Sequence, residues 1–545
     1  MQGQIANFEK LFNLYYSSMH KMKNRLLLSL ITLFLALPVL AATLPEGVNY
    51  SINSDGKTLT ITKSTFSGDL VIPETVDIDG KEYKVTIIGA TAFQNCLGLT
   101  SIQLPPSVTM IGRYAFNKCS DLTSVVIPPS VVHIEERAFG YCTALSSIEI
   151  PSSVATIGVT AFEGCSSMVS INVTDNFNFE SVDGILFNKA KTMLLCYPAG
   201  KAGTDGKYTI PEYVTELGDY SFSGCKKLYA VEIPATVKSA GIYVFKDCTY
   251  LTSVSIPESF SSISKGLFSS CKGLSSFTVP SSIKSIEDYA FSGCNGLISI
   301  DLPLSIISIG EHSFQSCSSL STISLPSSIK KISDYAFDGC SGLTMVGIPH
   351  GVEEIGLSAF GGCGALISIN LPPSVISIGD YAFGRCSGLK EVEIPSSVIS
   401  MGDKAFYRCS GLIAVEIPSS VTTIGNEAFS VCRGLTSVTY NTVNPIVCDK
   451  SVFSDVTFSK AVLYVAEGGV ENARTTEPWR NFTTIEALPT SGIDEVGADA
   501  TIDYSAPVQV YNMQGVLVGT STDGLAPGAY IVRQGSKTAK IAIGL

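Results

Sequence analysis

"LISIDLPLSIISIGEHSFQSC" (Leu297–Cys317) is one period of a repeat that decides the fold. The second half of "LISIDL" alternates, with Ile300 and Leu302 facing one way and Asp301 the other, which predicts a short strand. Pro303 ends that strand, because its nitrogen carries no hydrogen for a strand ladder. The residues after it must turn back toward the next strand through a second short extended piece and an irregular or one-turn helical segment. One copy cannot enclose its apolar side chains alone, so stability must come from stacking copies on one another.

The repeat continues in fixed register through most of the chain. Fourteen of the 16 cysteines fall in two runs with steps of 23 residues, and each of them has a phenylalanine three positions earlier. These cysteines are at positions 96, 119, 142 and 165, and then at 225, 248, 271, 294, 317, 340, 363, 386, 409 and 432. Self-similarity at a fixed period of this length indicates a solenoid. We therefore expect a β-rich solenoid of about 14 regular 23-residue coils within residues 85–440.

The repeat unit resembles the leucine-rich repeat of the BspA-like, Treponema-type family of bacterial surface proteins. The motif is carried, for example, by "LTSVVIPPSVVHIEERAFGYC" (Leu122–Cys142), and it recurs over about two-thirds of the chain. The resemblance implies a leucine-rich repeat fold and an exported surface protein that mediates adhesion. It names no ligand, because a shared fold does not specify a function.

The array is interrupted once. Between Cys165 and Cys225 the spacing of 60 residues exceeds two periods by 14, which marks residues 166–219 as an irregular insert. Within it, Asp183-Gly184 and the apolar runs "ILF" and "MLLCY" predict a hairpin inserted into the stack. The insert serves the structure or helps to bind a ligand, and both interpretations stay open.

The two ends of the stack need covers, because an exposed terminal coil presents unpaired strand edges. Residues 42–84 are alternating and turn-rich, so we expect a β cap there. Residues 441–486, with Trp479 and Phe482, depart from the repeat and are expected to cap the last coil.

A small module of short strands and Gly-containing turns is expected over residues 487–545. Its pattern favours a β-sandwich-like fold. On "VYNMQG" and "LAPGAYIV" it resembles the carboxy-terminal sorting and anchoring domains of proteins exported across the outer membrane of Gram-negative anaerobes.

The first residues indicate export. A short basic start, the apolar run Leu26–Leu37 and the small residues around Val39–Ala41 form a secretory signal peptide, expected over residues 1–41 with Met22 as the true start. No later segment is apolar over a sufficient length to cross a bilayer as a helix. We expect a protein that is secreted, or held at the outer membrane or cell surface, after cleavage.

Composition and charge narrow the partners. The chain has 545 residues, 45% of them apolar, and is therefore able to bury a large core. Its formal net charge is −12, so it has no general attraction to phosphate backbones. Nucleic acid is not an expected partner.

The cysteine row raises three possibilities. Structural zinc sites need thiolates paired two to four residues apart, whereas these cysteines occur once per coil, so no metal site is expected. Neighbouring strands lie about 4.8 Å apart, which is inside the Cα range of a disulfide, but parallel side chains keep the β-carbons too far apart. A buried free cysteine packs as a small hydrophobe, and this is the favoured interpretation, with occasional bridges between neighbouring coils as the alternative.

No catalytic motif stands out. His133, His312 and His350 lie in separate coils, outside any nucleophile, metal or phosphate-loop context. Carboxylates are plentiful, yet nothing selects a glycosidase pair among them. We expect no cofactor and no enzyme activity, with a hydrolase as a remote alternative.

Two outward rows are the candidate binding residues. The first follows the outward position of the predicted strands and is polar and partly acidic: Glu149, Asn172, Glu232, Asp301, Asn370, Glu393 and Glu416. The second lies two positions before the repeat phenylalanine: Tyr114, Tyr220, Tyr243, Tyr289, Tyr335 and Tyr381. Both rows are either solvated faces of a scaffold, with the tyrosines stacking on their neighbours, or a long surface whose aromatic anchors contact protein or glycan.

A long, rigid, repeated surface without convergent chemistry suits recognition over a large area. The first hypothesis is therefore adhesion, with host matrix proteins, cell-surface proteins or other cells as partners. The second is a glycan-binding surface module.

Overall fold

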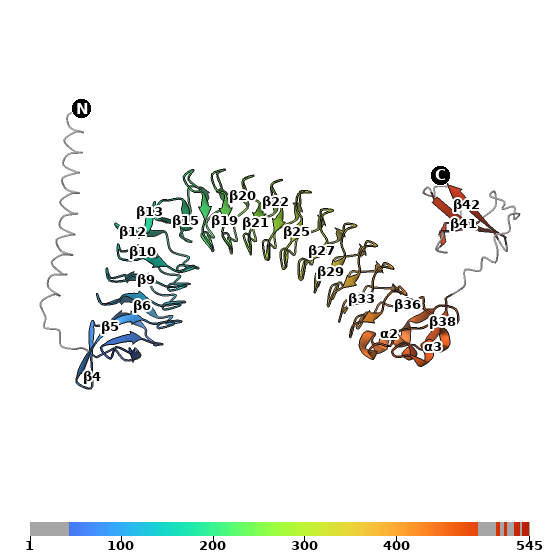
Figure 1. Ribbon diagram of the computed structural model, residues 1–545, viewed down its shortest axis with the longest axis horizontal. Coiled ribbons are helices and arrows are strands. Elements are labelled where there is room, and N and C mark those ends of the chain that lie inside the picture. Colours follow the sequence, from blue (N-terminus) through green and yellow to red (C-terminus); the bar gives the residue numbers. More distant parts are fainter. Residues whose placement is uncertain (1–42, 489–507, 513–516, 520–527, 535–536, 544–545) are drawn as a thin grey trace, which may run out of the picture. The chain divides into compact units, whose positions relative to one another are not determined.

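The computed structural model describes residues 43–488, 508–512, 517–519, 528–534 and 537–543. It divides into two compact units, one ending at Ala190 and the other beginning at Lys191, and each is described by itself (Figure 1). The expected signal peptide, residues 1–41, lies outside the described residues. No helix in the described ranges is long and apolar enough to span a membrane.

Each regular coil of the second unit contains one longer and one shorter strand. In the quoted period these are β24 (Ser299–Asp301) and β25 (Ser308–Ile309). β24 pairs in parallel with β22 (Ser276–Thr278), and β25 pairs with β23 (Ser285–Ile286), with a shift of one coil. The middle residue Ile300 is buried while its neighbours Ser299 and Asp301 are exposed, as the alternation predicts. The β-rich solenoid with coils of about 23 residues is confirmed.

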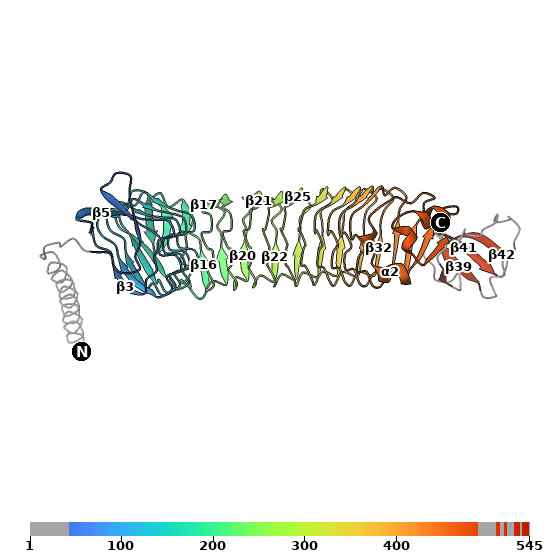
Figure 2. The same ribbon diagram turned by 90° about the horizontal axis from the view of Figure 1, so that it is seen from below.

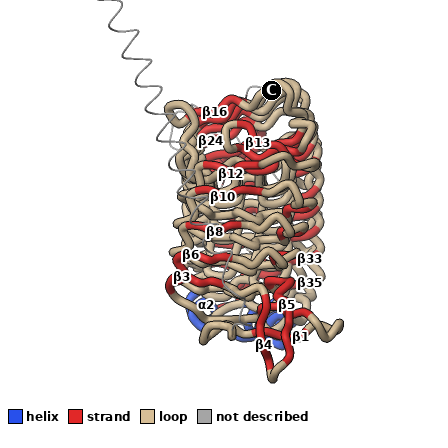
Figure 3. Tube along the Cα trace, turned by 90° about the vertical axis from the view of Figure 1, so that its left-hand side faces the viewer, coloured by secondary structure: helices blue, strands red, loops and turns tan. Residues whose placement is uncertain are grey.

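The strands of the second unit form two rows (Figure 2), and the strands of the first unit do the same (Figure 3). The long-strand row consists of β16 (Lys207–Thr209), β18 (Ala230–Glu232), β20 (Ser253–Ser255), β22, β24, β26 (Thr322–Ser324), β28 (Met345–Gly347), β30 (Ser368–Asn370), β32 (Glu391–Glu393), β34 (Ala414–Ile417), β36 (Ser437–Tyr440), β37 (Val462–Val465) and β38 (Thr484–Ala487). The short-strand row consists of β15 (Met193–Cys196), β17 (Glu216–Leu217), β19 (Ser239–Ala240), β21 (Ser262–Ile263), β23, β25, β27 (Lys331–Ile332), β29 (Glu354–Ile355), β31 (Ser377–Ile378), β33 (Ser400–Met401) and β35 (Thr423–Ile424).

The first unit has the same two rows. Its long strands are β3 (Gly68–Val71), β6 (Leu99–Gln103), β8 (Ser124–Val126), β10 (Ser147–Ile150) and β12 (Ser170–Val173). Its short-strand row is β2 (Thr58–Ile61), β5 (Lys81–Ile88), β7 (Met110–Ile111), β9 (His133–Ile134) and β11 (Thr156–Ile157). Two antiparallel strands flank the start of this row: β1 (Tyr50–Ile52) pairs with β2, and β4 (Thr75–Ile78) pairs with β5.

The core is a set of side-chain columns that run from coil to coil. The Phe291 and Phe314 rings stack with centroids 5.3 Å apart and an interplanar angle of 3°. Each repeat phenylalanine of the second unit from Phe245 to Phe429 stacks on the next one, whereas the Phe222 and Phe245 rings are tilted by 32°. Stacked aromatic pairs add to the free energy gained by burying the rings. A single coil therefore has no complete core of its own.

The segment after the short strand is held by turns of positive φ rather than by a helical turn. Tyr289, two residues before Phe291, has φ 59°, and Gly293, just before Cys294, has φ 74°. Every second residue of this segment donates its backbone N–H to a backbone carbonyl of the next coil. Tyr289 donates to Glu311, Phe291 to Ser313 and Gly293 to Gln315, at 2.7–2.9 Å. This third ladder satisfies buried backbone groups that the two strand rows do not reach.

The hairpin predicted in the insert is present in the first unit. β13 (Phe179–Val182) pairs antiparallel with β14 (Ile185–Asn188), and Asp183 and Gly184 between them both have positive φ. Such a two-residue turn matches the twist of the flanking strands. In the run "MLLCY", Met193–Cys196 form β15, which pairs in parallel with β17.

The remaining elements follow the last regular coil. They are η1 (Lys450–Val452), α2 (Asp455–Lys460), α3 (Val470–Thr475) and η2 (Trp479–Asn481). Trp479 is fully buried, and its indole N–H donates to the Ile446 carbonyl at 2.7 Å. Further along, β39 (Gln509–Asn512), β40 (Leu517–Gly519), β41 (Gly528–Gln534) and β42 (Lys537–Ile543) form one antiparallel sheet. Val508, Val510 and Val532 pack together in it.

Candidate binding surfaces on the coils

The outward positions of the long strands carry the first predicted row. Glu149 and Asn172 in the first unit are exposed and adjacent in register on β10 and β12. In the second unit Glu232, Asp301, Asn370, Glu393 and Glu416 are all exposed. Asn370, Glu393 and Glu416 are direct partners on β30, β32 and β34. The structure thus brings these three together in a line, with the strand spacing of about 4.8 Å between neighbours.

Exposed apolar side chains accompany this acidic line. Ile298, Ile367 and Ile413 occupy the same place in their coils, directly before β24, β30 and β34, and are 52–55% exposed. Large exposed apolar side chains next to charged ones are typical of surfaces that bind other proteins. The apolar residues were not among the predicted site residues, although their 23-residue spacing is visible in the sequence.

A shallow hollow of about 420 Å³ opens on the same face at Asp301. It is lined by Ser299, Ile300, Asp301, Leu302, Thr322, Ile323, Ser324, Met345 and Gly347. It exists because the neighbouring outward positions carry small side chains, and at Gly347 an added Cβ would meet no atom within 4 Å. The hollow offers one carboxylate and several hydroxyl groups to a ligand.

The tyrosine row is broken into short stacks. Tyr220 and Tyr243 stack with centroids 5.2 Å apart, while Tyr289 and Tyr335 lie on either side of His312, each 4.5 Å from its ring. All of the predicted tyrosines, including Tyr114 and Tyr381, are half-buried and have positive φ. Cations add to the stacks, with the Lys404 ammonium 5.4 Å from the Tyr381 ring centroid. One face of most of these rings is therefore occupied by the next coil.

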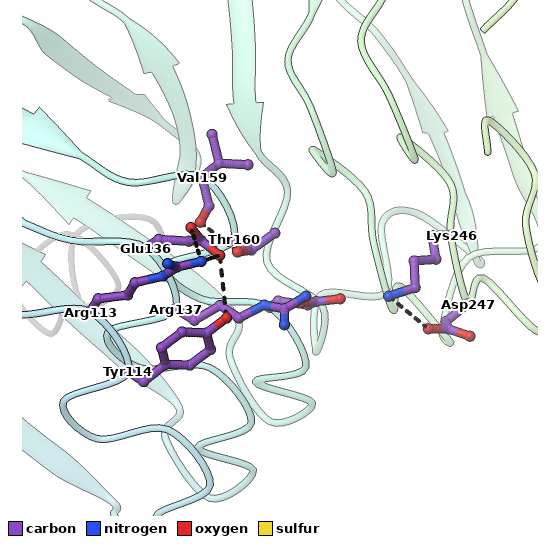
Figure 4. A network of polar contacts seen from close by, with 9 residues as sticks. Arg113, Tyr114, Glu136, Arg137, Val159, Thr160, Lys246 and Asp247 are labelled. Atoms are coloured by element: carbon purple, nitrogen blue, oxygen red, sulfur yellow. Dashed lines mark hydrogen bonds and ion pairs between the residues drawn. The ribbon is translucent and has the colours of Figure 1, made fainter. Parts of the chain in front are cut away.

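In the first unit Tyr114 belongs to a polar network (Figure 4). The Arg113 guanidinium lies 2.9 Å from the Glu136 carboxylate, and the Tyr114 hydroxyl donates to the same carboxylate at 3.5 Å. The hydrogen bond to Glu136 and its charge raise the pKa of Arg113. Arg137 pairs at 2.9 Å with Glu163, whose side chain is only 3% exposed. The charges of the network pair with one another, so the network fits a structural role.

The cysteine row is buried. In the second unit the regular cysteines from Cys225 to Cys432 are free thiols. Burial raises the pKa of the Cys294 thiol to about 12. Protonated, buried thiols are poor nucleophiles and poor metal ligands. In the described part of the chain, no group of three or more His, Cys, Asp and Glu residues is placed to hold a metal ion.

The three histidines lie apart, as their positions indicate. His133 is exposed and bonds to the Thr156 hydroxyl at 2.9 Å, and His312 bonds to the Gln315 amide oxygen at 3.1 Å. His350 is exposed in a turn. None of these contacts is an arrangement of nucleophile, base and orienting group.

A second hollow was not predicted. It lies in the second unit beside Tyr229 and Tyr250, and both rings are more than half exposed. The signal was present in the sequence as a local departure from the repeat, because Tyr229 is the only aromatic residue four positions after a repeat cysteine.

Comparisons with known proteins agree with the repeat. The model of the family described as BspA type leucine rich repeat region matches in 6 copies, over residues 59–193, 206–295, 261–374 and 354–465. No curated protein matches the chain.

Several solved structures are similar to the chain. A leucine-rich repeat protein from Bacteroides ovatus is 23% identical, with 82% of this chain and 99% of that chain covered and a TM-score of 0.48. A leucine-rich cell surface protein from Faecalibacterium prausnitzii is 25% identical, with 57% and 95% covered and a TM-score of 0.36. The pneumococcal vaccine antigen PcpA is 17% identical, with 82% and 98% covered and a TM-score of 0.36.

Proposed function

Because the chain belongs to the BspA-type leucine-rich repeat family, we propose that it is an exported surface protein that binds other proteins and so mediates adhesion. The partners would be host matrix proteins, cell-surface proteins or other cells. The contact surface would be the exposed face of the long-strand row in the second unit. The module at residues 487–545 would sort or anchor the protein at the cell surface.

One observation carries this proposal most directly, namely the register of acidic and apolar side chains on β30, β32 and β34. Glu393 and Glu416 are paired neighbours, and Ile367 and Ile413 lie at the same edge of that strand row. The stacked core beneath fixes the backbone that carries these side chains, so little backbone entropy is lost on binding. The exposed isoleucines, with Lys390 on the coil between them, and the line of carboxylates are complementary to a partner surface with apolar and basic residues.

A neutral glycan is the second candidate ligand. The hollow at Asp301 favours it, because a carboxylate and hydroxyl groups of Thr322 and Ser324 line a recess of about 420 Å³. Recesses of this size accommodate small ligands, and sugar hydroxyls pair with such groups.

The test is a binding screen of the purified chain against host matrix glycoproteins and polysaccharides. A variant with Glu393→Gln and Glu416→Gln should lose affinity for its protein partner by about fivefold or more at low salt. Glu216→Gln with Glu353→Gln is the matched control, because it alters exposed residues of the short-strand row, one in β17 and one directly before β29. Binding only to polysaccharides, or equal effects of the two double variants, would overturn the proposed adhesion surface.

A further inference from the structure

The hollow beside Tyr229 and Tyr250 has a chemistry unlike that of any other outward surface described above. Its volume is about 540 Å³, and Lys226, Lys227 and Asp205 line it together with the two tyrosines. All five residues are exposed. A recess of this size lies within the range of small-ligand sites, and its walls combine aromatic rings with cations.

The residues of this hollow break the repeat at the positions that line it. The second residue after the repeat cysteine is Gly, Ser or Ala in eleven of the fourteen coils, whereas Lys227 and Tyr250 occupy it here in two successive coils. Small residues prevail there because space is short: at Gly296 an added Cβ would lie 2.2 Å from the Lys272 carbonyl oxygen. Both side chains are exposed, so packing of the core does not explain them.

The insert supplies the other wall. The loop before β16 ends at Gly206, which lies one period before Tyr229. Gly206 has a φ of 73°. A Cβ on Gly206 would lie 2.3 Å from the Tyr229 ring, so the ring rests directly on this backbone. β16, which begins after the loop, pairs with β18 and so fixes the loop beside the Tyr229 coil (Figure 2). The Tyr229 side chain remains 53% exposed and Tyr250 60% exposed.

The charge of the hollow is opposite to that of the chain. Lys226 and Lys227 contribute two cations against the single carboxylate of Asp205, while the chain carries a net −12. Within the described residues neither lysine forms an ion pair, so both ammonium groups are available to a ligand. An anionic group placed between them gains attraction that extends over about 8 Å at physiological ionic strength.

We propose that this hollow binds an acidic oligosaccharide, a chain of sugar rings that bears carboxylate or sulfate groups. The Tyr229 and Tyr250 rings would pack against the apolar faces of sugar rings, and Lys226 and Lys227 would bind the acidic groups. Two exposed aromatic rings beside two cations in one open recess favour this ligand over an acidic peptide, which binds mainly along strand edges or over larger flat areas. The hollow lies at β16 and β18 of the long-strand row, whereas the adhesion proposal rests on β30, β32 and β34. The two tests use different variants, so either proposal can fail while the other stands.

The experiment is isothermal titration calorimetry of the full chain with trigalacturonic acid and with a chondroitin sulfate tetrasaccharide. We expect at least one of them to bind, with affinity falling as salt rises, and maltotriose to bind at least about tenfold more weakly. The two acidic probes distinguish carboxylate from sulfate recognition. A decamer of glutamate is titrated in parallel, and tighter binding of that peptide would overturn the assignment to a glycan.

Matched variants locate the site. Lys227→Ser and Tyr250→Ser restore residues that other coils carry, so folding is retained, and each should lower the affinity by about fivefold or more. Lys272→Gln is the control, because Lys272 follows a repeat cysteine directly, as Lys226 does, and lies outside the hollow. Absence of binding by both acidic saccharides, or equal affinities of the Lys227→Ser and Lys272→Gln variants, would overturn the proposal.

Discussion

The thiol of Cys294 donates a hydrogen bond to the carbonyl oxygen of Phe268, one coil earlier, at 3.1 Å. The same oxygen accepts the backbone N–H of Cys271 at 3.0 Å. The contact recurs along the second unit from Cys248 to Cys432 at 3.0–3.3 Å. The cysteine is therefore more than a small apolar residue, because its S–H links each turn to the previous coil.

Cys294→Ala removes this link and leaves a small cavity. We expect the free energy of unfolding to fall by about 1–2 kcal/mol, from lost packing and one lost weak hydrogen bond. Urea denaturation followed by circular dichroism measures it. Cys448→Ala is the control, because Cys448 is only partly buried and lies outside the row. An equal loss in both variants would contradict a specific role for the row.

The buried thiols should also make stability depend on alkaline pH. Burial raises the pKa of Cys340 and Cys386 from 9.0 to about 12. Because the folded-state pKa is above the unfolded value, this contribution is complete below pH 9 and is lost as pH rises toward 12. Denaturation midpoints should therefore fall across that window, and less so after Cys386→Ala.

Thiol counting tests the same row independently. In native protein at pH 8, the regular cysteines should react slowly with an aromatic disulfide reagent, because few thiolates form and access is blocked. Denatured, unreduced protein should then show close to its full number of thiols. A count near zero would mean that neighbouring coils are bridged, and the packing interpretation of the cysteines would fail.

The columns and strands could be predicted from sequence because each depends on residue type at a fixed position. Ile300 and Phe291 have apolar roles that repeat in every copy, and the proline at position 303 recurs in twelve of the fourteen copies. The positive φ two residues before the phenylalanine could not be found in this way, because the position holds Tyr289, His312 and Gly266 in different coils. Hydrogen bonds between coils, such as that from the Tyr289 N–H to the Glu311 carbonyl, hold this positive φ. They involve the backbone alone, so they do not select a residue type at this position.

That position gives a further prediction at Tyr335, which has φ 57° and stacks on His312. Tyr335→Ala loses the ring contact but keeps a left-handed backbone that disfavours a Cβ. Tyr335→Gly loses the same contact and relieves the backbone, so it should be more stable than the alanine variant by about 1 kcal/mol. Urea midpoints of the two variants, measured side by side, decide this. An alanine variant that is the more stable of the two would rule out backbone strain at this row.

The last prediction concerns Glu416, which faces Glu393 directly across β34 and β32. Like charges at this spacing repel, so Glu416→Gln should raise the free energy of unfolding by about 0.2–0.5 kcal/mol at low salt. The gain should vanish at 1 M salt, where the screening length is about 3 Å. Residues kept at a cost in stability are expected where a surface serves recognition, so the same variant should bind the protein partner less well. A variant that is less stable at low salt would show that Glu416 instead stabilises the fold, and would remove the argument that its charge is retained for binding.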